Sequence, residues 1–125
     1  MLYFGFGNFA FNDKSSESTI FMIVSAKCRY NEPQKFLTEA FRYLDEKIDP
    51  GYNTAAEYEG ASLKEGQYLN IVEQWISTMN ERIEIQVSDI LKTYRIKHAQ
   101  YDPFCDEFLL ETANEYILFH WSTAA

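Results

Sequence analysis

Cysteine, proline and histidine are all scarce: the 125 residues include 2, 3 and 2 of them respectively. Cys28 and Cys105 lie far apart, and no C-x-x-C pair occurs. The sequence therefore predicts two reduced thiols rather than a disulfide framework or a zinc finger. A chain of this length buries roughly two-thirds of the surface that its unfolded form exposes. We expect one domain, residues 1–125, stabilised by its core alone.

Segments that would target the chain to a membrane are also missing. The N-terminal stretch from Leu2 to Phe11 is apolar, but it is far shorter than the about 20 residues that span a bilayer. No basic residues precede it, and no small-residue cleavage site follows it. We therefore predict a strand here and a cytoplasmic location for the protein.

Positive charge is in deficit. Lysine and arginine number 11 against 19 aspartates and glutamates, a net charge of −8. A protein that binds DNA or RNA directly needs a basic surface, and so does a helix that lies on anionic lipid. The sequence therefore argues against both. The excess lies in residues 45–63, with a net charge of −4, and in residues 98–125, with a net charge of −5.

The longest regular pattern present is a stripe of apolar residues from Tyr68 to Tyr94. Its members recur at steps of three and four, which is typical of one face of a helix. Residues Arg82–Ser88 also alternate like a strand, so a break between Asn80 and Ser88 stays open. The preceding stretch, Gly51–Glu65, has no clean period and is interpreted as a loop, with a short helical turn at Thr54–Tyr58 as an alternative.

Other elements follow from simpler patterns. Pro33 opens a helix whose apolar stripe runs to Ile48, ahead of the break at Pro50. Four strands are expected, in two hairpins: Leu2–Phe11 with Thr19–Ala26, and Phe108–Glu111 with Glu115–Trp121. The sequence thus predicts an α+β fold with an antiparallel sheet of about four strands. The two central helices are expected on one face, in the order ββ-α-α-ββ. The strand order is not predicted.

Side chains that carry chemistry are few. The one dense group of metal-ligand types is Asp102, Cys105 and Asp106, with His98 or His120 to complete it. Its spacing matches no zinc pattern, and one thiolate among carboxylates is an unusual zinc set. No local signature supports a cysteine–histidine nucleophile either. We therefore predict no catalytic residue, no metal site and no cofactor.

Aromatic residues are interleaved with the two acidic segments. Carboxylates there would steer a basic partner, while tyrosines would supply contact area. The residues predicted to bind a partner are Tyr52, Glu57, Tyr58, Glu59, Tyr101, Asp102, Asp106 and Glu107.

This profile favours a non-enzymatic module that binds a basic protein, as do the small acidic immunity proteins that block bacterial toxin nucleases. A phage-type inhibitor that mimics DNA follows the same electrostatic logic and is one alternative. The other is a small-molecule-binding domain or small enzyme with an aromatic pocket between helices and sheet. Exposed sheet edges allow either a monomer or a homodimer.

Overall fold

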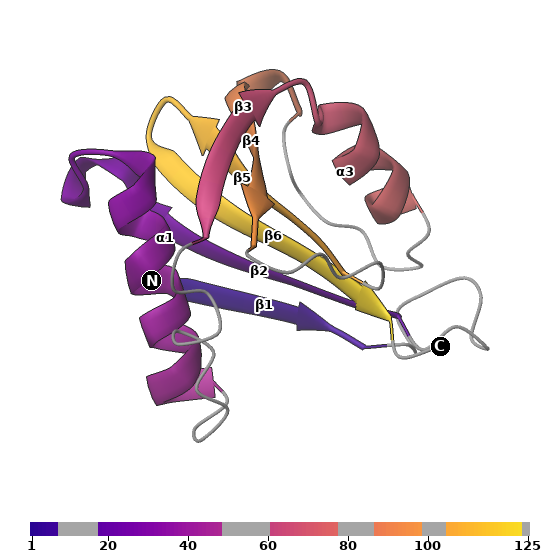
Figure 1. Cartoon of the computed structure of the whole chain (residues 1–125), viewed down its shortest axis with the longest axis horizontal. Coiled ribbons are helices and arrows are strands. Elements are labelled where there is room, and N and C mark those ends of the chain that lie inside the picture. The colour runs from indigo at the N-terminus through magenta and orange to yellow at the C-terminus, as the bar shows by residue number, and fades with distance from the viewer. Residues whose placement is uncertain (8–17, 49–60, 78–86, 99–104, 124–125) are drawn as a thin grey trace.

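The computed structural model describes residues 1–7, 18–48, 61–77, 87–98 and 105–123. In these residues one antiparallel sheet contains six strands in the order β1-β2-β6-β5-β4-β3 (Figure 1). The strands are β1 Leu2–Phe6, β2 Ser18–Ala26, β3 Ser62–Gly66, β4 Ile90–Lys97, β5 Cys105–Thr112 and β6 Glu115–Thr123. The helices are α1 Pro33–Tyr43, which continues into the π-helical turn η3 Leu44–Ile48, and α3 Leu69–Ser77. Two 3-10 turns are η2 Lys27–Arg29 and η4 Val87–Asp89.

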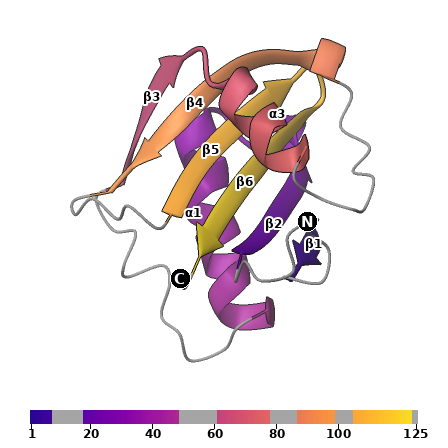
Figure 2. The same ribbon diagram turned by 90° about the vertical axis from the view of Figure 1, so that its right-hand side faces the viewer.

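Helices α1 and α3 cover opposite faces of the sheet, so the fold has three layers (Figures 1 and 2). The central strands explain why. Side chains alternate between the two faces of a strand, and β5 and β6 are apolar at consecutive positions, such as Leu109 and Leu110. Both faces of these strands must therefore be covered, and one helix lies on each.

The core is accordingly divided in two by the sheet. The α3 side contains Ile20, Met22, Val72, Phe108, Leu110, Ile117 and Phe119. The α1 side contains Ile23, Phe36, Leu37, Ala40, Phe41, Leu44, Ile96, Leu109, Tyr116 and Leu118. Phe36, Phe108 and Phe119 are each fully buried. Removing a side chain of this size from water contributes about 1.5–3 kcal/mol, so both halves of the core stabilise the sheet.

The predicted sheet of about four strands, with both helices on one face and the order ββ-α-α-ββ, is wrong, although the α+β class is right. The two unexpected strands pair with each other as β3 and β4. Strand β3 lies at the end of the stretch Gly51–Glu65 that was interpreted as a loop. The central strands are apolar on both faces, so each face needs a helix to cover it. The two helices therefore cannot both lie on one face, as was predicted.

The stretch Tyr68–Tyr94, expected to be helical with a break between Asn80 and Ser88 left open, is helical in its first part and a strand in its last. Among the described residues of this stretch, helix α3 covers Leu69–Ser77, and Ile90–Lys97 forms β4. The expected break at Asn80–Ser88 lies largely outside the described residues. Strand β4 is rich in β-branched and aromatic residues, which suit a pleated surface. Residues Ile90–Lys97 also have a helical period. They form a strand because β4 is hydrogen-bonded to β3 on one edge and to β5 on the other.

One hydroxyl fixes α3 to the sheet. Thr93 Oγ1 on β4 donates a hydrogen bond to the carbonyl oxygen of Gly66 at 2.6 Å. It also accepts one from the backbone N–H of Tyr68 at 3.0 Å. The end of β3 and the start of α3 therefore share one buried side chain, which satisfies backbone groups that the turn would otherwise leave unpaired.

Several elements were predicted correctly. Strands β1 and β2 pair as the expected N-terminal hairpin, in which β1 ends at Phe6; residues 8–11 of the predicted strand lie outside the described residues. The helix that begins at Pro33 is α1. Strands β5 and β6 form the C-terminal hairpin, in which β5 begins at Cys105 rather than at the expected Phe108. Cys28 and Cys105 are both free thiols.

Candidate functional site: a buried histidine–carboxylate cluster

Six of the eight residues predicted to bind a partner lie outside the described residues: Tyr52, Glu57, Tyr58, Glu59, Tyr101 and Asp102. The other two, Asp106 and Glu107, are neighbours on β5, and strand alternation sends them to opposite faces of the sheet. Asp106 lies on the α3 side and Glu107 on the α1 side. The two carboxylates therefore belong to different environments.

Asp106 is held by two donors from different elements. Trp75 Nε1 on α3 donates to Asp106 Oδ2 at 3.3 Å. Arg95 Nη2 on β4 donates to Asp106 Oδ1 at 3.2 Å. The carboxylate thus links α3 to the sheet. Since it is partly exposed and already paired with a guanidinium, its charge is partly offset within the chain.

Glu107 is buried, with only 3% of its surface exposed. Both of its carboxylate oxygens accept hydrogen bonds from histidines: Oε1 from His98 Nε2, and Oε2 from His120 Nδ1 at 3.0 Å. Burial by itself raises the pKa of this carboxyl, but the hydrogen bonds from His120 and then His98 outweigh it and hold the pKa at about 2. Glu107 is therefore an ionised carboxylate inside the fold and not a surface contact.

Cys105 completes the cluster. Its Sγ lies 3.8 Å from His120 Nδ1. The sulfur, a carboxylate oxygen of Glu107 and a ring nitrogen of His120 all lie within 4.8 Å of one another. The ring of Phe21 on β2 stacks on the imidazole of His120, with centroids 4.3 Å apart and planes 12° apart. Three strands, β2, β5 and β6, thus contribute to the cluster, together with His98, which immediately follows β4.

This geometry does not match a cysteine–histidine–acid triad. In a triad the acid binds one imidazole nitrogen and the nucleophile is hydrogen-bonded to the other. Here Cys105 Sγ and Glu107 Oε2 both approach the same atom, Nδ1 of His120. A proton on Nδ1 that bonds to the carboxylate leaves no lone pair there to accept the thiol proton. As arranged, the cluster does not activate the sulfur as a nucleophile.

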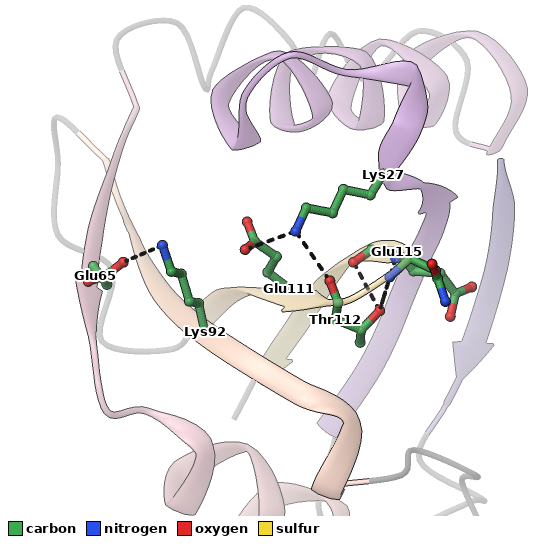
Figure 3. A network of polar contacts seen from close by, with 7 residues as sticks. Lys27, Glu65, Lys92, Glu111, Thr112 and Glu115 are labelled. Atoms are coloured by element: carbon green, nitrogen blue, oxygen red, sulfur yellow. Dashed lines mark hydrogen bonds and ion pairs between the residues drawn. The ribbon is translucent and has the colours of Figure 1, made fainter.

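Glu111 is a second buried acid on the same face, four residues along β5. It forms an ion pair with Lys27, with Nζ 3.2 Å from Oε2, and the same Nζ donates to the carbonyl oxygen of Thr112 at 3.4 Å (Figure 3). Lys27 itself is positioned by its backbone N–H, which donates to the carbonyl oxygen of Asn114 at 2.8 Å. Of the four described acids after residue 98, only Glu115 is exposed.

The group considered in the sequence contains Cys105, His98 and His120, as the cluster in the structure does. Its acids were Asp102 and Asp106, whereas the acid in the structure is Glu107. The signal that would have selected Glu107 is the two-residue spacing from Cys105, which puts both on one face of a strand. This spacing was missed because the strand was expected to begin at Phe108. The pairing of Glu107 with His120 across the hairpin also required the register, which the structure supplies.

Comparison with known proteins adds no further constraint: no family model, no curated protein and no solved structure matches the chain. None of the described helices has the length and apolarity that crossing a membrane would need.

Proposed function

We propose that this chain is a non-enzymatic, cytoplasmic protein that binds a basic protein and masks its working surface, as an immunity or inhibitor protein does with a toxin nuclease. One observation carries the proposal, namely where the negative charge lies. The described residues contain 11 acidic and 9 basic residues, a net charge of −2. The remaining residues contain 8 acidic and 2 basic ones, a net charge of −6.

The described strands and helices are thus nearly neutral, and much of their charge is paired internally. Lys27, Arg42, Lys92 and Arg95 each form an ion pair with an acid of the same chain. Three quarters of the excess charge belongs to residues outside the described ranges, Glu57, Glu59 and Asp102 among them. A concentration of carboxylates there would steer a basic partner and set its orientation.

Glu57, Glu59 and Asp102 are the acids on which the proposal depends, with Tyr52, Tyr58 and Tyr101 supplying apolar contact area. Asp106 contributes less to the binding surface than the sequence suggested, because its carboxylate is hydrogen-bonded to Trp75 and Arg95. The arrangement around His120 supports a non-enzymatic role, since both the thiol and the carboxylate approach one ring nitrogen.

The first protein to test as the partner is the product of the neighbouring gene. The tagged full chain, mixed with that product, should retain it at low ionic strength and lose part of it as salt rises, because salt screens steering charges. A toxin gene next to this one favours an immunity protein, whereas a phage operon favours a DNA-mimicking inhibitor. Retention that does not change with salt would contradict an electrostatic interface.

The binding surface is tested by association kinetics with that partner. The triple variant Glu57→Gln, Glu59→Gln, Asp102→Asn should associate roughly tenfold more slowly at low salt and show a weaker salt dependence. Its matched control is the triple variant Glu73→Gln, Asp89→Asn, Glu115→Gln. This control removes three exposed carboxylates of the described residues and has the same net charge. If both variants slowed association equally, total charge and not the proposed surface would be responsible.

A further inference from the structure

Three side chains on the α1 face place a sulfur, an oxygen and a nitrogen donor together. Cys105 and Glu107 are two residues apart on β5, and His120 is the direct cross-strand partner of Glu107 on β6. All three donor atoms lie within 4.8 Å of one another. We propose that Cys105, Glu107 and His120 bind a divalent transition-metal ion, with zinc as the ion that this donor set fits. The proposal is independent of the acidic binding surface.

The spacing of the donors suits tetrahedral coordination. With metal bonds of about 2.3 Å to sulfur and about 2.0 Å to nitrogen or oxygen, neighbouring ligand atoms are separated by roughly 3.3–3.6 Å. Cys105 Sγ is 3.8 Å from His120 Nδ1, and that nitrogen is 3.0 Å from Glu107 Oε2. One distance is slightly longer and the other slightly shorter than the ideal, so small side-chain rotations would place an ion between the three atoms.

The surroundings hold these ligands in orientation. Stacking on Phe21 fixes the plane of the His120 ring. The oxygen of Glu107 that faces away from His120 accepts a hydrogen bond from His98 Nε2. A ligating carboxylate whose second oxygen is hydrogen-bonded in this way is a common support for metal sites. Both ligand-bearing strands are central in the six-stranded sheet, which gives the site a rigid base.

The chemistry of the donors selects the ion. Thiolate and imidazole favour zinc and similar transition metals, whereas magnesium and calcium prefer oxygen ligands alone. A thiolate and a carboxylate together carry two negative charges, which balance one divalent cation. As the bonds form, the Cys105 thiol releases a proton to solvent, and His120 binds through Nδ1 as a neutral imidazole whose proton lies on Nε2. Three protein ligands leave a fourth position for water, and Cys105 and His120 are each only partly buried.

Cobalt(II) is the probe, because it occupies zinc sites and a thiolate ligand gives it a sulfur-to-metal charge-transfer band. The metal-free full chain should bind one equivalent of cobalt with that band, and one equivalent of zinc should remove it. Cys105→Ser should lose the band and bind zinc at least tenfold more weakly. Cys28→Ser, which removes an exposed cysteine elsewhere, should behave like the wild type.

His98 provides a second readout that does not depend on the ligands themselves. His98→Gln keeps all three proposed ligands, so the charge-transfer band should persist while zinc affinity falls about 10–100-fold. Circular dichroism of each metal-free variant verifies folding. A wild-type chain that shows no charge-transfer band at stoichiometric cobalt would overturn the proposal. So would a band that survives in Cys105→Ser and disappears in Cys28→Ser.

Discussion

Glu107 and His120 face each other across the β5–β6 pair, and His120 Nδ1 donates to Glu107 Oε2 at 3.0 Å. Register decides which acid is buried in this way. A shift of one residue in β5 would exchange the faces of Asp106 and Glu107. The buried acid would then be the shorter Asp106, and Glu107 would lie on the α3 side. The hairpin therefore determines the electrostatics of the cluster as well as the packing of the core.

The depressed pKa of Glu107 predicts a pH dependence of stability. Its ordinary pKa is 4.5 and its folded value is about 2, so the unfolded state binds the extra proton between these values. The stabilisation is complete above pH 4.5 and is lost as the pH falls toward 2, at about 1.4 kcal/mol per pH unit. Between pH 4.5 and 3, wild type should therefore lose about 2 kcal/mol more than Glu107→Gln.

Urea denaturation in the presence of a chelator measures this difference without a contribution from metal. Glu115→Gln is the control, since Glu115 is exposed and its replacement should leave the slope unchanged. Parallel curves of unfolding free energy against pH for wild type and Glu107→Gln would mean that the histidine bonds do not hold the carboxylate ionised.

The three-layer arrangement predicts that both helices contribute to stability through one face each. Leu37 on α1 and Val72 on α3 are each 1% exposed, while Thr38 and Glu73 beside them are exposed. Leu37→Ala should lower the free energy of unfolding by about 2–5 kcal/mol, and Val72→Ala by about 1.5–3 kcal/mol. Thr38→Ala and Glu73→Ala should change it by less than about 0.5 kcal/mol. If Val72→Ala were as mild as Glu73→Ala in chemical denaturation, α3 would not be docked on the sheet.

The ion pair between Lys27 and Glu111 predicts non-additive mutations. Glu111 is 8% exposed, so Lys27→Met leaves a buried carboxylate without its cation and should cost roughly 1–3 kcal/mol. The double variant Lys27→Met, Glu111→Leu removes both charges and should be more stable than Lys27→Met alone. A double-mutant cycle by thermal and urea unfolding measures the coupling, with the exposed pair of Lys92 and Glu65 as the comparison (Figure 3). Additive costs would show that the buried pair contributes no more than the exposed one.

Two stacked tryptophans offer a matched comparison on the α3 side. The ring centroids of Trp75 and Trp121 are 3.9 Å apart, and the angle between the ring planes is 11°. Trp75 Nε1 bonds to Asp106, whereas the buried Nε1 of Trp121 has no hydrogen-bond partner among the described residues. Replacement by phenylalanine keeps an aromatic ring in either case, but only Trp75→Phe removes a hydrogen bond to a carboxylate. Trp75→Phe should therefore cost roughly 1–2 kcal/mol more than Trp121→Phe in urea unfolding. Equal costs would assign the whole effect to ring size.

How much could be predicted from the sequence differs between the two ends of the chain and its middle. Helix α1 follows from Pro33 and a regular apolar stripe, and the C-terminal hairpin follows from the turn at Thr112–Asn114. These elements are fixed by local patterns. Residues Ile90–Lys97 carry both a helical and a strand pattern, and the choice between them came from the pairing with β3 and β5.

The candidate site shows the same division. Scarce histidine and cysteine already singled out Cys105, His98 and His120 as the residues able to carry chemistry. Their acid partner was assigned to Asp102 and Asp106, because the strand was expected to begin at Phe108 and not at Cys105. Choosing Glu107 needed the strand boundary, which places Cys105 and Glu107 on one face, and the cross-strand register, which spacing along the chain does not encode.

The sequence by itself determined the α+β class, the negative charge and its concentration in two segments, because these depend on composition and on local periodicity. Only the tertiary structure decided that the helices cover opposite faces and that Glu107 is buried between two histidines. Both outcomes depend on which strands lie side by side. Strand pairing joins residues that are far apart in the sequence. It is determined by the need to bury both faces of β5 and β6 at once.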